Sequence, residues 1–245
     1  IDEAAVEAES LVLLGGVLAE GGQREEAEAT LRKALHRAEA AGHDEARARG
    51  LGLLIGVVGF RKGESTSELE DRFEAVRQRF GDLPSRALVD YLLGVTMVRI
   101  GHGRIVEATV AAREALEETH RLGLDATKAH TQLGLALTLL GRYEEARLEL
   151  ATAIEGIDMQ HPDAVLVLGV SGIHRGFVGE DQAAVESFER ALALEAERKL
   201  GQPHYRALVG TYMAISVDRL GNPDKAIFMQ RTAIAALKQL WGPEH

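Results

Sequence analysis

Residues 127–157 read TKAHTQLGLALTLLGRYEEARLELATAIEGI and contain two apolar segments separated by Gly141. In the second segment three residues recur at helical spacing: Ala146, Leu150 and Ala153. Apolar residues three and four positions apart form a stripe along one side of a helix, so this stretch predicts two amphipathic helices joined by a tight turn. Gly134, in the first segment, has no side chain and would let the second helix approach closely.

The same arrangement recurs along the whole chain. Six positions carry the small residue of the first segment: Gly15, Gly56, Gly94, Gly134, Gly172 and Ala214. Their spacing is roughly 40 residues, within the range of helical repeat proteins. The copies around Gly56 and Gly94 are longer at the turn, and Gln230 stands where the last copy should have a large apolar residue. We therefore predict an all-α fold, an α-α superhelix (solenoid) of about six helix hairpins.

The repeat spacing predicts one array over residues 1–245. Its expected repeats are 1–42, 43–82, 83–123, 124–161, 162–201 and 202–241, with the start of a truncated seventh repeat at 242–245. Glycines suit the left-handed position after several second helices: Gly42, Gly81, Gly123, Gly201 and Gly242. The chain opens at Ile1 rather than Met, so we interpret it as an excerpt or a processed product.

One small residue in the first helix, with two small residues flanking a large one in the second, resembles the tetratricopeptide repeat (TPR). The resemblance covers nearly the whole chain. The period exceeds the usual TPR length of about 34 residues. Residues 201–204 (GQPH) and 242–245 (GPEH) resemble TPRs of the kinesin-light-chain-like type, whose relatives occur in bacterial signalling proteins. The first-helix Trp of many TPRs is absent, and the equivalent positions hold Leu11, Asp90, His130 and Leu168.

The resemblance implies a non-enzymatic scaffold that holds a protein or peptide, within a larger signalling or regulatory protein. It also implies that the first helices line a concave face. Mapping the copy around Gly134 onto the others gives the candidate partner-binding residues: Arg61, Tyr91, Arg99, Lys128, Thr131, Gln132, Phe177, Tyr212 and Arg219. Burial of the aliphatic first-helix residues between repeats is the competing interpretation. An alternative function is a domain that senses a peptide or small molecule by changing its superhelical pitch.

The composition narrows the chemistry of the partner. Asn222 is the single Asn, whereas TPRs that clamp a terminal carboxylate resemble one another in a Lys and Asn pair, so we do not expect such a clamp. An apolar groove with arginines at its rim suits an amphipathic helix or a hydrophobic motif with acidic neighbours. That segment could belong to the same polypeptide. Exposed repeat ends also allow self-association.

The net charge and the residue composition argue against several other classes of protein. The net charge of −10 disfavours nucleic acid and anionic membrane surfaces, which bind clustered Lys and Arg. No cysteine is present, so neither a disulfide framework nor a thiolate zinc site can form. The longest uncharged stretch, Gly50–Phe60, is shorter than the ~20 residues of a spanning helix. We expect a cytoplasmic protein, and the Arg-rich, Ala-rich usage suggests a bacterial source.

No catalytic motif emerges from the sequence. Gly50, Gly52 and Gly56 lack the spacing of a nucleotide-binding loop. The nine histidines are scattered, and no pair has the spacing of a zinc site. Ser171 lacks the context of a nucleophile elbow. We therefore expect no catalytic residue, no metal and no cofactor, and we predict that the protein is not an enzyme.

Overall fold

The computed structural model describes every residue except 1–2, 60–65, 81–84, 156, 201–202 and 242–245. The described residues form twelve α-helices and no strand. In chain order these are α1 (Glu3–Glu20), α2 (Arg24–Ala41), α3 (Asp44–Val58), α4 (Ser67–Phe80), α5 (Arg86–Gly101), α6 (Ile105–Arg121), α7 (Thr127–Leu139), α8 (Tyr143–Glu155), α9 (Ala164–Phe177), α10 (Asp181–Glu197), α11 (Pro203–Arg219) and α12 (Pro223–Trp241). Neighbouring helices pack in chain order, as in a TPR-like helical solenoid, so the predicted fold class is confirmed.

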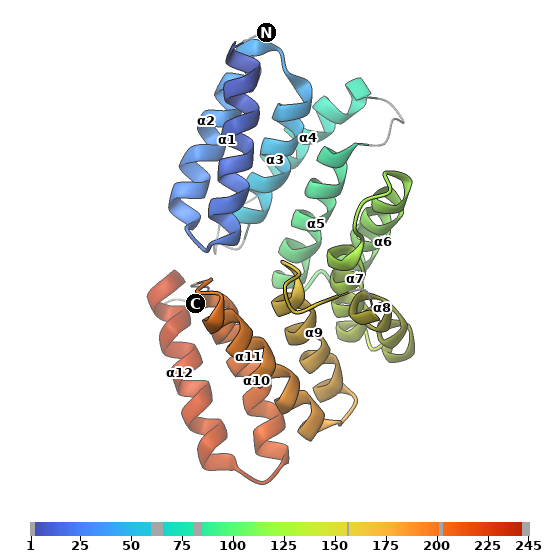
Figure 1. Ribbon diagram of the computed structural model, residues 1–245, viewed down its shortest axis with the longest axis vertical. Helices are drawn as coiled ribbons and strands as arrows, with labels where there is room; N and C mark the ends of the chain where they lie inside the picture. The colour runs from blue at the N-terminus through green and yellow to red at the C-terminus, as the bar shows by residue number, and fades with distance from the viewer. Residues whose placement is uncertain (1–2, 60–65, 81–84, 156, 201–202, 242–245) are drawn as a thin grey trace. The chain divides into compact units, whose positions relative to one another are not determined.

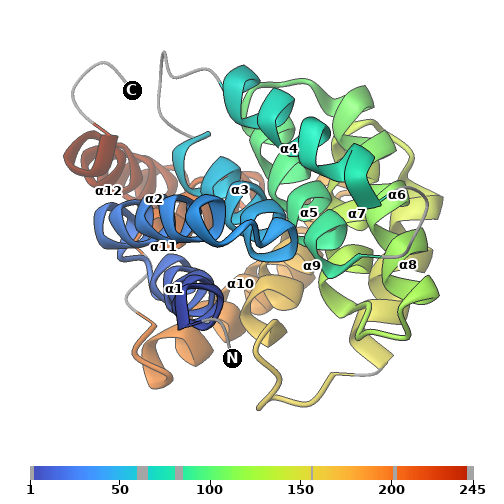
Figure 2. The same ribbon diagram turned by 90° about the horizontal axis from the view of Figure 1, so that it is seen from above.

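The chain divides into two compact units, residues 1–125 with α1–α6 and residues 126–245 with α7–α12. In unit 1, α1, α2 and α3 lie side by side, and α3 also packs on α4 and α5 (Figures 1 and 2). In unit 2, α9 packs on α7, α8, α10 and α11, and α11 packs on α12. The single array over residues 1–245 and its repeat boundaries stay predictions.

Three of the recurring glycines pack each first helix against its own second helix. A Cβ atom added at Gly15 would lie 2.6 Å from Leu31 Cγ, and one added at Gly134 would lie 2.7 Å from Leu150 Cγ. At Gly172 the neighbour is the Phe188 ring, also at 2.7 Å. The glycine therefore accommodates the large residue of the second helix. All three large residues are buried.

Gly56 and Gly94 have a different role from the one expected. A Cβ atom added at Gly94 would lie 3.0 Å from Gly52 O, and one added at Gly56 would lie 3.6 Å from Gly94 Cα. One added at Gly52 would lie 2.8 Å from Tyr91 N. These glycines therefore bring α3 and α5 together, which are the first helices of consecutive hairpins. The expectation that Gly56 and Gly94 face their own second helices is corrected accordingly.

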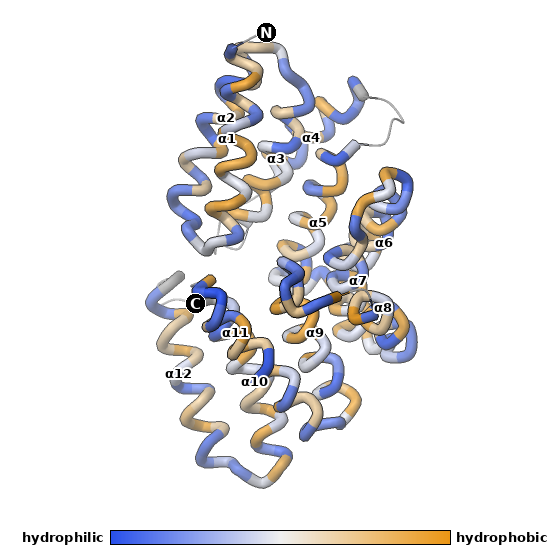
Figure 3. The backbone as a smooth tube through the Cα atoms, in the orientation of Figure 1, coloured by the Kyte–Doolittle hydropathy of each residue, from blue (hydrophilic) through white to orange (hydrophobic). Residues whose placement is uncertain are grey.

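The helix ends follow the sequence where they are described. Gly42 and Gly123 adopt positive φ angles of 63° and 62°, as expected for glycines after a second helix. Gly81, Gly201 and Gly242 lie outside the described residues. In unit 2 the turn between α11 and α12 is hydrophilic, while apolar residues recur along both helices (Figure 3). Such polar turns end each helix and leave its apolar stripe for packing.

Candidate functional site

The predicted residues of unit 1 are engaged in packing between helices. The rings of Tyr91 on α5 and Phe73 on α4 stack with centroids 3.8 Å apart, and burial raises the pKa of Tyr91 to about 12. Arg99 Nη2 lies 3.8 Å from Glu70 Oε2, and Arg99 Nη1 donates to Glu107 O at 3.4 Å. Both side chains are half-buried. Arg61 lies outside the described residues.

The predicted residues at the start of unit 2 are largely covered. Thr131 and Gln132 are buried, with exposed fractions of 0% and 4%, and Lys128 is half-buried. Thr131 Oγ1 donates to Thr127 O at 2.7 Å. Both side chains are therefore covered by neighbouring residues, and their predicted role in partner binding stays a prediction. They are covered because α7 is buried continuously from Thr131 to Thr138, so it has no outward face there.

Phe177 and Tyr212 are brought together by α9 and α11. Their ring centroids are 6.2 Å apart, Phe177 is 41% exposed, and Tyr212 is half-buried, which raises its pKa. Leu208 and Ile215 are 43% and 41% exposed and stand four positions before and three positions after Tyr212. That spacing puts the three residues on one side of α11. We call Phe177, Leu208, Tyr212 and Ile215 the α11 stripe.

Arg219, near the α11 stripe, contacts residues of neighbouring helices. Its Nη1 donates to Gly176 O at 2.7 Å and lies 3.5 Å from Asp181 Oδ1. The guanidinium thus joins the end of α11 to the end of α9 and the start of α10. Its predicted role in partner binding stays a prediction.

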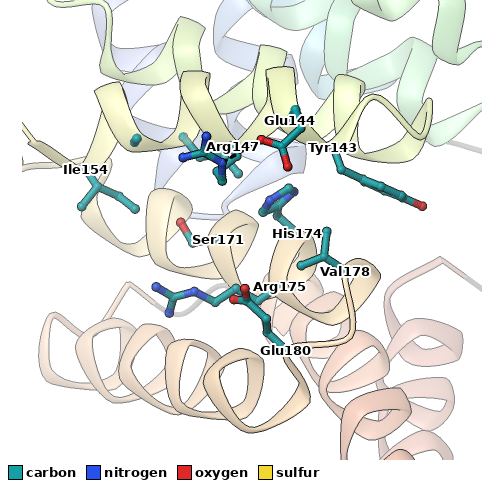
Figure 4. A pocket seen from close by; sticks show the side chains of 11 residues that line it. Tyr143, Glu144, Arg147, Ile154, Ser171, His174, Arg175, Val178 and Glu180 are labelled. Carbon is teal, nitrogen blue, oxygen red and sulfur yellow. Dashed lines mark hydrogen bonds and ion pairs between the residues drawn. The ribbon is translucent and has the colours of Figure 1, made fainter.

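A pocket of about 350 Å³ lies between α8 and α9, and none of the described predicted residues lines it (Figure 4). Helix α8 contributes Tyr143, Glu144 and Arg147, and α9 contributes His174 and Arg175. Arg147 Nε donates to Glu144 Oε2 at 3.1 Å. Sequence reasoning missed this pocket because its lining residues share no motif and meet only when α9 packs on α8.

His174 is a buried group of this pocket. Thr138 Oγ1 donates to Gly134 O at 2.8 Å and contacts His174 Nδ1 at 3.1 Å, and the direction of the second hydrogen bond depends on the imidazole tautomer. Burial lowers the pKa of His174, and Arg175 and Arg147 add to this effect against the opposite influence of Glu180 and Glu144. The imidazole is therefore neutral at pH 7.

Ser171 does not pair with His174. Its hydroxyl donates to Val167 O at 2.7 Å, within α9. A nucleophilic serine needs its proton directed at a base, which is not the arrangement here. Among the described residues, no group of three or more His, Asp or Glu side chains is arranged to hold a metal ion.

The fold is that of a helical repeat protein built from helix hairpins. Comparison with known families makes this more specific, because residues 8–40 and 127–155 match the model of the tetratricopeptide repeat. The first match falls on α1 and α2 in unit 1, and the second on α7 and α8 in unit 2. These two matches support the assignment of the matched helix pairs to the tetratricopeptide repeat family. Repeats of this family generally mediate protein–protein interaction and are typically non-catalytic. No curated protein matches the chain.

The helices were also compared with the requirements of a lipid bilayer. In the part of the chain that is described, none has the length and hydropathy together of a bilayer-spanning segment.

Proposed function

We propose that this chain is a protein-interaction scaffold, within a larger signalling or regulatory protein, that binds an apolar peptide or helix across α9 and α11. The observation that carries the proposal is the α11 stripe. Exposed apolar side chains are common singly, but a contiguous group usually marks an interaction site. Aromatic residues are also the side chains that most often dominate binding energy.

The geometry favours a partner that approaches along α11. Leu208, Tyr212 and Ile215 repeat at the spacing of two helical turns, which is how a helix offers its side to a second helix or to an extended apolar segment. Phe177 from α9 widens the stripe beside Tyr212. The sequence predicts that first helices line the binding face. We propose this role for the first helices α9 and α11 of unit 2, with Phe177 and Tyr212 at the centre of the face.

The test compares two exposed surfaces of the same unit. Phe177→Ala combined with Ile215→Ala removes two stripe side chains, and Leu148→Ala is the matched control because Leu148 is 59% exposed on α8. Truncating central aromatic and aliphatic contacts typically costs more than 1 kcal/mol each, so we expect at least about tenfold weaker binding for the double variant.

The measurement is affinity capture from a lysate of the source cells with wild type, double variant and control in parallel, followed by titration of the captured protein. A partner retained by wild type and by Leu148→Ala, and lost by the double variant, supports the proposal. Equal capture by all three proteins would place the interaction surface elsewhere.

A further inference from the structure

A second surface of unit 2 runs along the other side of α9. The pocket in Figure 4 continues into a smaller pocket of about 120 Å³, and the two share Ile154, Ser171 and Arg175. The smaller pocket is bounded by α8, by α10 and by the segment that joins α8 to α9. We call this continuous depression the α8–α10 groove. Arg175 is two residues from Phe177, a rotation of about 200° around a helix, so the groove and the α11 stripe lie on opposite sides of α9.

The smaller pocket combines an apolar lining with two arginines. Its apolar residues are Ile154, Ile157, Met159, Val167 and Leu168. Its charged residues are Arg175 and Arg190, and no Asp or Glu lines it. Neither arginine forms an ion pair with any residue that the structure describes. The chain carries a net charge of −10 and the larger pocket is also lined by Glu144 and Glu180, so the smaller pocket is the part of the groove without an acidic residue.

Hydrogen bonds within the chain hold the walls of the α8–α10 groove in position without a bound partner. Arg198, just beyond α10, donates to His161 O at 2.9 Å and also to Met159 O, which anchors the segment between α8 and α9. Arg175 Nη1 donates to Ser187 Oγ at 2.5 Å, which orients its guanidinium against α10. Arg175 Nη1 also donates to Ala183 O at 3.5 Å, whereas its Nε and Nη2 form no hydrogen bond with a described residue. A cation held in this way binds a carboxylate with little further loss of side-chain freedom.

The size of the groove limits what it can hold. Pockets that enclose a whole small molecule usually span about 300–1,000 Å³. The larger pocket reaches only the lower end of that range, and the smaller one is far below it. Two linked depressions of unequal size instead match neighbouring side chains of a peptide, one large and apolar and the other short.

We propose that the α8–α10 groove binds a peptide segment of a partner protein in which an Asp or Glu stands close to a large apolar side chain. The apolar side chain packs on Ile154, which lines both pockets. The carboxylate accepts hydrogen bonds from Arg175 and Arg190 over the smaller pocket. This site is separate from the α11 stripe and goes beyond the function proposed above.

The probe is a set of synthetic peptides obtained by selecting a random phage-displayed library on the wild-type chain, with counter-selection on Arg175→Gln/Arg190→Gln. The expected peptides carry an acidic residue next to a large apolar one. Binding of these peptides to the double variant should be at least about tenfold weaker, because charge-assisted hydrogen bonds are lost. Arg190→Gln alone, at an exposed position, should weaken binding in the same direction if Arg175→Gln disturbs packing with Ser187.

The matched control is Lys225→Gln/Arg231→Gln, which removes the same charge from exposed positions of α12 and should leave peptide affinity unchanged. Phe177→Ala/Ile215→Ala should also retain the peptides, so failure of the α11 stripe and failure of this groove are distinguishable. Octanoate, an apolar carboxylate without a peptide backbone, should not displace them. Selected peptides without an acidic residue, equal loss of binding in the α12 control, or displacement by octanoate would each overturn the proposal.

Discussion

Gly134 and Gly210 are both helical glycines of unit 2, yet the space around them differs. A Cβ atom at Gly134 would lie 2.7 Å from both Cγ and Cδ2 of Leu150, whereas the first neighbour of one at Gly210 is Ala233 Cβ at 4.0 Å. Leu150 is buried, and a Cβ atom at Gly134 would force it to move. The two positions therefore separate the effect of packing from that of helix propensity.

Gly134→Ala should destabilise the protein and Gly210→Ala should stabilise it. Overpacking costs about 1–3 kcal/mol, while replacing a helical Gly by Ala gains about 1 kcal/mol where space allows. Thermal unfolding followed by circular dichroism would measure both, with a shift of about 2–4 °C per kcal/mol for a chain of this size. An unchanged or raised Tm in Gly134→Ala would mean that the α7–α8 contact is looser than described.

The recurring glycines also show how much of the packing inside a hairpin can be predicted from single residues in the sequence. Leu31, Leu150 and Phe188 each follow a recurring glycine by the same number of residues, so the pairing inside a hairpin is visible in the sequence. Gln230 stands at the corresponding position after Ala214 and donates from Nε2 to Thr211 O at 3.0 Å, replacing an apolar contact by a hydrogen bond. The copy around Gly94 is longer at the turn, but the sequence does not indicate that Gly94 contacts another first helix.

At the level of helices, His174 connects α9 to α7 through Thr138 and gives the pair a dependence on pH. The pKa of His174 is lowered from 6.5, chiefly by burial, so the folded state disfavours its protonation. Above pH 6.5 the imidazole is neutral in both the folded and the unfolded chain, and its contribution to stability is fully present. As pH falls below 6.5, the unfolded chain gains a proton first, and stability declines until the folded pKa is reached.

We expect the NMR titration of the His174 Cε1 proton to have a midpoint below 6.5. His174→Gln should lose part of the decrease in Tm that wild type shows between neutral and mildly acidic pH. A midpoint at or above 6.5 would contradict the burial described for this side chain.

Helix-level packing also explains which parts of the candidate sites could be anticipated. The sequence places Phe177 and Tyr212 on first helices, and the structure brings the two rings together. The α8–α10 groove could not be anticipated, because its floor, walls and end come from α8, α9, α10 and a connecting segment held by Arg198. The spacing of apolar residues in the sequence predicts a helix and its apolar side. It does not predict the groove that forms between the second helices α8 and α10.

For the molecule as a whole, a helical repeat fold makes stability local, because each helix packs mainly on its neighbours in the chain. Gly52→Ala in unit 1 would place a Cβ atom 2.8 Å from the backbone nitrogen of Tyr91, which can only be relieved by separating α3 from α5. Gly134→Ala strains α7 against α8 in unit 2 in a similar way.

Hydrogen exchange measured by mass spectrometry should therefore show faster exchange in α3 and α5 for Gly52→Ala and in α7 and α8 for Gly134→Ala. Wild type measured under the same conditions is the reference. Uniformly faster exchange over all twelve described helices in both variants would show one cooperative unit, and the division into two compact units would then carry no energetic meaning.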